Sequence, residues 1–441
     1  MNTTVPARPG ADDQSDPGAG TGGGSILRVI VAAVFGNALE WYDFTIYAFL
    51  APIIGRQFFP KSTDTVALLA TFAVFGIGFV ARPLGGVLIG VVGDRMGRKP
   101  ALLLTIMLMA LGTVTIGLLP GYASIGIAAP VLLVLARAFQ GFSAGGEWGS
   151  SASFLVEWAP TKRRGLIGSC HTGSIFIGQL VGTGIAASLT TLLGSASMEN
   201  WGWRVPFLLG ALIGPLGLLA RRRIDETPVF LKASQAYPQA ASGPAARMPM
   251  GTMMFAFCFV AVQSVAIYVF LSYFPTFLQR NLGWAASLSL WSTALATVAT
   301  GIAVVGSGFI SDRIGRKPPL LFSCLVFLLL SYPLVWLMLH MHSVPLAIAV
   351  QVVLSANCGL FIGSMTTALV EMFPTRRRLT GLNTAYNLAS MVFGGFAPFI
   401  ATELISMTGQ SIAVTYYVIL GALVSLPAVL MFRETAGQPL D

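Results

Sequence analysis

The sequence predicts an all-α integral membrane protein with twelve transmembrane helices, arranged as two parallel six-helix repeats. Three observations support this fold class. Of the 441 residues, 55% are hydrophobic and only 10% are charged, whereas soluble proteins carry about 25% charged residues. Long apolar runs follow one another along the whole chain, and a short, strongly charged motif occurs once in each half.

The same composition excludes several classes of protein. The net charge of +9 would suit a nucleic-acid partner, but the basic residues separate apolar runs and form no basic face, so we expect none. The four Cys and three His residues show no metal-ligand spacing, and the chain has neither a Walker loop nor a nucleophile constellation. We therefore expect no enzymatic activity, no metal and no bound cofactor.

Each apolar run is long enough to cross the hydrocarbon core as a helix, which takes about 20 residues. The runs are continuous, whereas the strands of a membrane barrel alternate over about 10 residues. We predict twelve spans, at residues 28–54, 65–92, 100–120, 127–157, 166–193, 203–221, 251–279, 286–310, 318–339, 344–373, 380–407 and 412–432.

Two polar stretches mark the divisions of the chain. The first residues are rich in Pro, Gly, Asp and Ser and are expected to be disordered. The second stretch divides the spans six and six. The predicted units are a disordered cytoplasmic tail (1–25), an N-terminal six-helix bundle (26–221), a central cytoplasmic loop (222–250), a C-terminal six-helix bundle (251–433) and a C-terminal tail (434–441).

The basic residues predict how the bundle is oriented. An even number of spans puts both termini on one side of the membrane. Of the 26 Lys and Arg residues, only Arg56, Lys61 and Arg280 lie in loops on the opposite side. Because basic loops stay in the cytoplasm, we expect both termini to be cytoplasmic.

The charged motif reveals an internal repeat. "GVVGDRMGRKP" begins at Gly90 and "GFISDRIGRKP" begins at Gly308; "EWAPTKRR" from Glu157 has a counterpart in "EMFPTRRR" from Glu371. Each pair falls in the same loop of its half. The orientation rule alone explains the Arg and Lys residues but not the matched Asp, Gly and Pro positions, so we infer two parallel copies of one six-span unit.

The repeated loop reverses the chain within a few residues, and Gly97 supplies the permissive backbone for that turn. Asp94 serves no topological purpose, because acidic residues hardly affect orientation. Its carboxylate is predicted to accept hydrogen bonds from a helix N-terminus or an Arg, and so to hold the cytoplasmic end shut in one state. The predicted gate residues are Gly90, Asp94, Arg95, Gly97, Arg98, Lys99, Asp312, Arg313, Gly315, Arg316 and Lys317, with Glu157 and Glu371 beside them.

Ionisable residues inside spans are costly and are functional candidates by default. Five are predicted here: Glu40, Asp43, Arg82, Arg137 and Glu147. Their levels along the helices predict that Glu147 pairs with Arg82, and that Asp43 or Glu40 pairs with Arg137. Three carboxylates then face two guanidiniums, and the remaining acid can bind a proton. A purely structural network that packs spans 1, 2 and 4 is the alternative.

Neutral polar residues could complete the site. Aromatic residues flank the acidic pair in span 1, where rings could also hold a quaternary ammonium group. For each residue of the second half, a structural hydrogen bond between helices is the alternative. The possible substrate contacts are Tyr42, Tyr47, Gln263, Tyr268, Asn357, Asn383, Tyr386 and Asn387.

These motifs carry a family resemblance. The two copies of G-x-x-x-D-R-x-G-R-K resemble the signature loop of the major facilitator superfamily, and "RAFQG" from Arg137 resembles its fourth-span motif. Five further stretches resemble the metabolite:proton symporter branch: "GNALEWYDFTIYAF" (36–49), "ARPLGG" (81–86), "GFSAGGEWG" (141–149), "WGWRVPF" (201–207) and "DETPVF" (225–230). The resemblance implies the major facilitator fold and a multi-pass protein of the bacterial inner membrane.

The resemblance also implies a function. Members of this branch take up citrate and related acids, 2-oxoglutarate, shikimate, or proline and betaine. We expect proton-coupled uptake of a small carboxylate-bearing metabolite by alternating access, driven by the proton gradient, in a monomer embedded in the lipid bilayer. The two buried Arg residues favour a di- or tricarboxylate such as citrate or 2-oxoglutarate. A proline or glycine betaine symporter, and a drug or metabolite exporter of the same fold, are the alternatives.

Overall fold

The structure of the chain is a computed structural model that describes residues 23–60, 64–222, 225–227, 229–231, 250–375 and 377–440. The predicted disordered tail lies outside these residues except for 23–25, which begin the first helix. Most of the predicted central loop, 222–250, also lies outside them.

The described residues form helices and no strand. The first half contains six long helices, α1 (Gly23–Phe49), α3 (Asp64–Met96), α4 (Arg98–Leu118), α6 (Ala128–Trp158), α7 (Arg164–Ser197) and α8 (Arg204–Arg222), and the short α2 (Ala51–Phe58) and α5 (Tyr122–Ile125).

The second half repeats this order. Two of its spans are helices interrupted by a π-helical turn, a feature that is frequent at functional sites. These are α10 (Met250–Ile267) with α11 (Phe274–Leu282), joined through Tyr268–Tyr273, and α15 (Arg378–Ala389) with α16 (Ala397–Thr408), joined through Ser390–Gly395. The others are α12 (Ala286–Ile314), α13 (Lys317–Met341), α14 (Val344–Met372) and α17 (Val414–Met431).

All twelve predicted spans coincide with helices. Within the described part of the chain, ten are long and apolar enough to cross a membrane, and α1 and α8 are the other two. The ends differ from the prediction, because hydropathy detects only the apolar portion of a helix. The helix α3 continues through Asp94 to Met96, and the first predicted span includes a break at Leu50, after which Pro52 lies in the first turn of α2.

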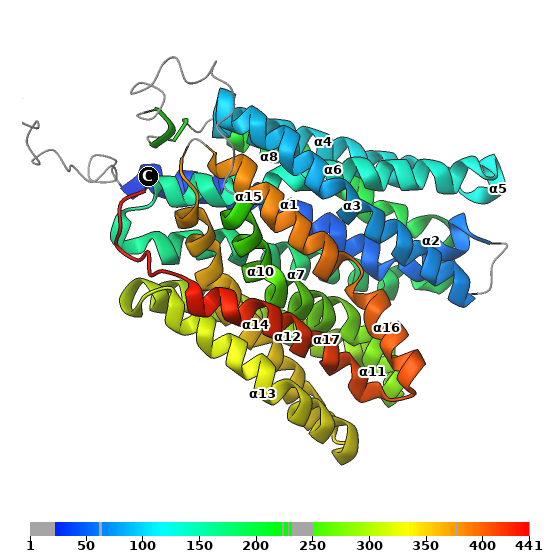
Figure 1. Cartoon of the computed structure of the whole chain (residues 1–441). Helices are drawn as coiled ribbons and strands as arrows, with labels where there is room; N and C mark the ends of the chain where they lie inside the picture. Colours follow the sequence, from blue (N-terminus) through cyan, green and yellow to red (C-terminus); the bar gives the residue numbers. More distant parts are fainter. Residues whose placement is uncertain are drawn as a thin grey trace, which may run out of the picture.

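The helices run roughly along one long axis of the molecule (Figure 1). The start of α1, the loops at Gly97 and Gly315 and the C-terminus lie at one end, which we call the basic end. The helices α2, α5, α11 and α16 lie at the other end, which we call the far end. Large apolar side chains such as Phe322, Leu329 and Trp336 of α13 are exposed on the outer surface, as expected of a lipid-facing helix.

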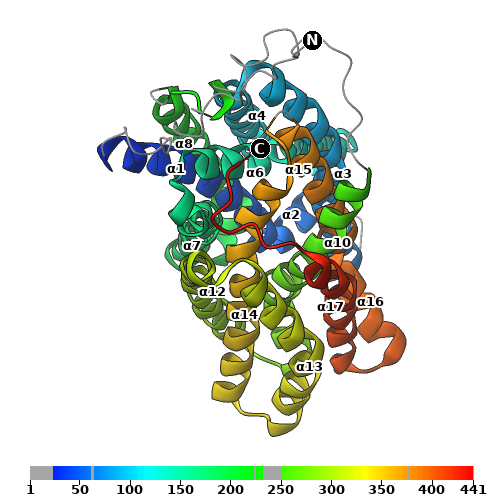
Figure 2. The same ribbon diagram turned by 60° about the vertical axis from the view of Figure 1, so that its left-hand side comes forward.

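The two halves meet along two symmetric seams (Figure 2). The second span of each half packs against the fifth span of the other half: α3 contacts α15, and α12 contacts α7. This exchange is the arrangement expected for two parallel copies related by a twofold axis. Inside the first half, a Cβ atom on Gly145 of α6 would overlap the carbonyl oxygen of Arg82 on α3. The two helices that carry Arg82 and Arg137 therefore pack backbone to backbone.

Candidate functional site

A chamber of about 360 Å³ lies between the two halves, in the part of the bundle nearer the far end. Its volume falls within the range of small-molecule pockets, about 300–1,000 Å³. Helix α1 presents one face to it, because Trp41, Thr45 and Ala48 recur at helical spacing, and Pro52 of α2 follows them. The polar and aromatic residues that line the chamber are Trp41, Phe44, Thr45, Phe49, Phe72, Phe75, Gln179, Thr183, Tyr268, Ser272, Thr276, Gln279, Arg280, Thr293 and Thr297.

The chamber wall carries little charge. Among the described lining residues, Arg280 is the only charged one, and it lies on α11 near the far end. Aromatic rings of Trp41, Phe44 and Phe75 form the wall on the side of the first half. A solute in the chamber would therefore meet one cation, several hydroxyl and amide groups, and a set of ring faces.

Arg82 lies behind this aromatic wall and is buried. Its guanidinium pairs with Glu40, with Nη2 3.5 Å from Oε1, and it lies beside Tyr268 of the chamber wall. Its Cζ atom lies 4.6 Å from the ring centre of Phe44 and 4.4 Å from that of Phe79. Arg82 therefore connects a buried acid to the solute chamber.

The predicted pairing of Arg82 with Glu147 is wrong. Glu147 accepts a hydrogen bond from the hydroxyl of Thr105 on α4, whereas the ion pair of Arg82 goes to Glu40. Matching levels along two helix axes does not fix the direction in which each side chain leaves its helix. Glu147 leaves α6 toward α4, and Arg82 leaves α3 toward α1.

Arg137 pairs with Asp43, as the helix levels predicted for that acid. Its Nη1 atom lies 3.6 Å from Oδ2 of Asp43. Gln140 bridges the pair, because it accepts from Arg137 at 2.8 Å and donates to Asp43 at 2.6 Å. The rings of Tyr47 and Phe44 lie 4.2 and 4.8 Å from the Arg137 Cζ atom. The guanidinium is thus enclosed by an acid, an amide and ring faces.

Most predicted substrate contacts lie in helix packing instead of the chamber wall. Tyr268 lines the chamber. The hydroxyl of Tyr42 donates to the Pro206 carbonyl at 2.8 Å, that of Tyr47 donates to the Thr71 carbonyl at 3.4 Å, and the Asn357 amide donates to the Ser323 carbonyl at 3.1 Å. Gln263 is buried in α10. Tyr42, Tyr47 and Asn357 therefore make hydrogen bonds between helices.

Three other predicted contacts join the two halves on the basic-end side of the chamber. Tyr386 of α15 stacks on Trp148 of α6. Asn383 accepts from the backbone N–H of Gly149 at 2.9 Å, and Asn387 donates to the Gly145 carbonyl at 2.6 Å. These contacts lie between the chamber and the basic end.

The repeated Asp residues bind helix N-termini across the interface between the halves. Asp94 accepts from the backbone N–H groups of Leu379 and Thr380 at 3.2 and 3.0 Å, in the first turn of α15. Asp312 accepts from Gly165 and Leu166 at 2.7 and 2.8 Å, in the first turn of α7. A carboxylate is favourable there because the helix N-terminus carries partial positive charge. We call these two contacts the paired locks.

Arg residues reinforce both locks. Arg98 lies 3.5 Å from Asp94 and 3.2 Å from Glu157, and Arg316 lies 2.7 Å from Asp312 and 3.2 Å from Glu371.

The remaining predicted gate residues lie in or beside the two turns. Gly97 and Gly315 have φ of 109° and 96°, so only Gly is accommodated at these turns without strain. Arg95 and Arg313 are exposed, and Lys99 and Lys317 begin α4 and α13. Gly90 packs against Thr380.

The comparisons with known proteins agree with this arrangement. A family model described as sugar (and other) transporter matches residues 29–250, and the model of the Major Facilitator Superfamily matches residues 256–440. The "Proline/betaine transporter" of Salmonella typhimurium is 32% identical over 95% of this chain and 85% of that protein. The "Citrate-proton symporter" of Klebsiella pneumoniae is 36% identical over 94% of each chain.

The chain belongs to the major facilitator superfamily. Both family models and both relatives describe transporters, so this superfamily member is a multi-pass membrane transporter and not an enzyme. Its fold also matches solved structures. The proton:xylose symporter XylE bound to 6-bromo-6-deoxy-D-glucose has a TM-score of 0.81 at 19% identity, covering 95% of this chain and 98% of that chain.

The superfamily member has a third repeated element that the sequence prediction missed. Glu226 accepts from the backbone N–H of Lys99 at 3.0 Å, and Glu434 accepts from Lys317 at 3.1 Å. Thr227 and Thr435, the next residues, donate to Glu157 and Glu371 at 2.6 and 2.5 Å. In the sequence this repeat is only a Glu-Thr pair shortly after the last span of each half. Two residues are too few to be recognised as a repeat without the structure.

Glu434 lies outside the spans. Burial by itself raises the pKa of its carboxyl group, but backbone N–H donors of Arg316, Ala436, Lys317 and Thr435 outweigh burial and hold the pKa below its usual value of 4.5. This carboxylate therefore binds the first turn of α13 in its charged form.

Proposed function

We propose that the chain takes up a small carboxylate-bearing metabolite together with protons by alternating access, in a bacterial inner membrane with the basic end facing the cytoplasm. The observation that carries the proposal is the position of the chamber. It lies between the halves toward the far end, while the paired locks join the halves at the basic end. Residues 26–221 and 251–433 would move as two bodies, and inward release requires the locks to open.

Three buried acids behind the chamber support the coupling to protons. Glu40, Asp43 and Glu147 share the interior of the first half with two guanidiniums. A buried carboxylate is tolerated when it is paired or when it carries a proton. Asp43 is the proposed coupling acid, because its ion pair with Arg137 is long, at 3.6 Å, and lies behind rings that form the chamber wall. The Klebsiella relative is a citrate-proton symporter by name, which also supports the coupling.

The charge on the chamber wall favours a zwitterionic solute, such as proline or glycine betaine. Arg280 is the single cation among the described lining residues and suits one carboxylate. The rings of Trp41, Phe44 and Phe75 suit an ammonium group. The names of the proline/betaine relatives support this choice.

A di- or tricarboxylate such as citrate or 2-oxoglutarate is the second candidate. The pair between Arg82 and Glu40 is long, at 3.5 Å, and the Arg82 guanidinium lies against the ring of Phe44, which lines the chamber. If Glu40 takes a proton, Arg82 becomes available to a second carboxylate. The citrate-transporting relative, at 36% identity, supports this candidate.

Uptake into proteoliposomes with an alkaline interior tests the proposal. Labelled proline, glycine betaine, citrate, 2-oxoglutarate and shikimate are offered separately, with and without a protonophore. We expect accumulation either of the zwitterions or of the organic acids, and we expect the protonophore to abolish it. Accumulation of none of them, or accumulation that ignores the pH gradient, would contradict proton-coupled uptake.

A further inference from the structure

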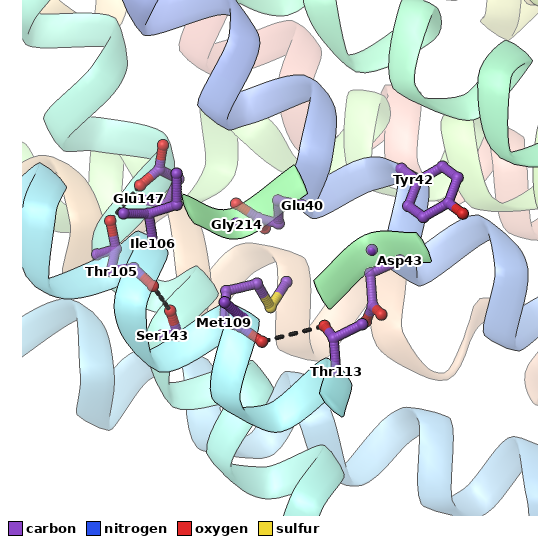
Figure 3. Close-up of a pocket in the computed structure, with 12 residues that line it drawn as sticks. Glu40, Tyr42, Asp43, Thr105, Ile106, Met109, Thr113, Ser143, Glu147 and Gly214 are labelled. Carbon is purple, nitrogen blue, oxygen red and sulfur yellow. Dashed lines mark hydrogen bonds between the residues drawn. The ribbon is translucent and has the colours of Figure 1, made fainter. Parts of the chain in front are cut away.

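A second, much smaller cavity lies inside the first half, between α1, α4, α6 and α8 (Figure 3). Its volume is about 30 Å³, which is room for one or two water molecules, since a buried water needs about 10–15 Å³. The three buried acids Glu40, Asp43 and Glu147 all line it. No solute of the proposed size fits there, but water does.

This water-sized cavity is separate from the solute chamber. The two share no lining residue. On α1, Trp41, Thr45 and Ala48 face the chamber, whereas Asp43 points to the nearly opposite side, because successive residues are turned by about 100° in an α-helix. A proton that travels through the cavity would therefore not pass through the solute.

The polar groups of the cavity are arranged along α4. Thr113 lies beside Asp43 through their shared partner Gln140, and Thr105, two turns nearer the basic end, donates to Glu147. Eight residues of helix rise separate the two threonines, or about 12 Å. In Figure 3, Glu40 lies between Glu147 and Asp43. The three acids therefore lie in the order Asp43, Glu40, Glu147 toward the basic end.

One atom of this set points to bound water. Asp43 is 2% exposed, and its Oδ1 atom has no hydrogen-bond partner within the protein. A buried carboxylate oxygen without a protein partner is the kind of group that internal water satisfies.

The other charged and titratable groups around the cavity already have partners. Arg137 faces Asp43, and Arg82 faces Glu40. The hydroxyl of Tyr42 donates to the Pro206 carbonyl. Among the described lining residues, α4 and α8 contribute no titratable side chain. Proton exchange within the cavity is therefore confined to the three acids and the water between them.

We propose that water in this cavity carries a proton from Asp43 through Glu40 to Glu147, so that the proton crosses the first half apart from the solute. This inference rests on the proposed proton-coupled uptake. At each step a carboxylic O–H gives its proton to water, the water passes one of its own protons to the next carboxylate, and no other bond changes. The reverse order of steps carries a proton the other way.

The route also explains how proton and solute are linked. Glu40 belongs to both networks, since it lines the cavity and pairs with Arg82, and Arg82 lies against the ring of Phe44, which lines the chamber. A proton on Glu40 removes the charge that holds Arg82. The guanidinium then turns its full charge toward the chamber, where a solute carboxylate can meet it.

The variant Glu147→Gln tests the route, with proton-driven accumulation and solute counterflow measured at one pH. Counterflow exchanges labelled for unlabelled solute and needs no net proton movement. We expect accumulation to fall at least tenfold while counterflow stays within about twofold of wild type. Glu147→Asp should restore part of the accumulation. Glu403→Gln, which removes an exposed acid of α16, is the matched control and should behave as wild type.

A second variant alters the water and leaves every acid in place. A methyl group added by Gly210→Ala would lie 3.0 Å from Thr113 Cγ2 and 3.3 Å from Tyr42 Cε1, against the cavity lining. We expect proton-driven uptake to slow at least threefold with unchanged counterflow. Wild-type accumulation by Glu147→Gln, or equal loss of counterflow and accumulation, overturns the route. Wild-type transport that ignores the pH gradient would instead contradict the proposed function.

Discussion

The indole ring of Trp148 stacks on the phenol ring of Tyr386, with centroids 3.8 Å apart and planes within 6°. Trp148 belongs to α6 of the first half and Tyr386 to α15 of the second half. Among the described residues the stack is the tightest ring contact across the interface between the halves, and it lies on the basic-end side of the chamber. In the proposed transport cycle, release of a solute toward the basic end requires these two rings to separate.

The variant Tyr386→Ala should weaken closure of the basic end. An aromatic pair contributes about 0.5–1.5 kcal/mol beyond its buried area, which corresponds to a roughly two- to tenfold shift toward the inward-open state. Labelling of a single Cys placed in α15 near Leu379, from the basic-end side, measures this shift. Tyr386→Phe keeps the ring and should label as wild type. Equal labelling of Tyr386→Ala and wild type would show that the stack does not hold the end closed.

The paired locks predict equal effects from two distant substitutions. Asp94→Asn and Asp312→Asn each remove a carboxylate from the first turn of a helix in the other half. A charge at a helix N-terminus contributes about 0.3–2 kcal/mol, so each variant should favour the inward-open state by a similar factor. The same labelling assay measures it.

The control for the locks is Asp225→Asn, because Asp225 is an exposed acid at the same end of the molecule. It should leave labelling and uptake unchanged. A large effect of Asp94→Asn together with no effect of Asp312→Asn would show that the two locks are not equivalent.

The comparison of sequence and structure shows which features a pattern can predict. Apolar length predicted all twelve spans, and the matched Asp94 and Asp312 predicted the symmetric contacts, because both depend on position along the chain. The direction of a side chain around its helix was not predictable, so Glu147 was assigned to Arg82. Gln140, which bridges Arg137 and Asp43, was missed because a neutral amide in a span looks like any packing residue.

The contact of Glu434 with the first turn of α13 should depend on pH. The pKa of Glu434 is lower in the folded protein than its usual value of 4.5, because backbone N–H groups stabilise the charged form. A lowered folded-state pKa contributes stability above the unfolded-state pKa, and that stability is lost as the pH falls through the folded-state pKa. The stabilisation is therefore present at pH 7 and disappears below about pH 4.5.

Thermal unfolding in detergent measures this dependence. Glu434→Gln should lower the unfolding temperature at pH 7 and should narrow the difference between pH 7 and pH 4. Asp225→Asn again serves as the control. An unchanged pH dependence in Glu434→Gln would mean that other acids account for the loss of stability at low pH.

Arg137→Ala should abolish accumulation while the protein remains folded and inserted in the membrane. The substitution removes the cation that stabilises the charged form of Asp43, 3.6 Å away, so the acid no longer releases its proton during the cycle. Proton-driven uptake and size-exclusion elution are measured together. Arg137→Lys keeps the charge but lacks the geometry to hold Gln140 and Asp43 at once, so partial activity is expected. Unaltered accumulation by Arg137→Ala would remove this residue from the mechanism.

Arg280→Gln distinguishes the two candidate solute classes. Arg280 is the only charged residue among the described residues of the chamber wall, and a hydrogen bond to a charged group contributes about 1.5–3 kcal/mol. Loss of it should raise KM roughly 10- to 100-fold for a solute with one carboxylate. For a di- or tricarboxylate that also reaches Arg82, the rise in KM should be smaller, because the second guanidinium still binds.

Arg56→Gln is the matched control for Arg280→Gln, since Arg56 is a far-end cation that pairs with Glu199 at 2.7 Å outside the chamber. An unchanged KM for every transported solute would show that the carboxylate binds elsewhere, and that the aromatic wall alone selects the solute.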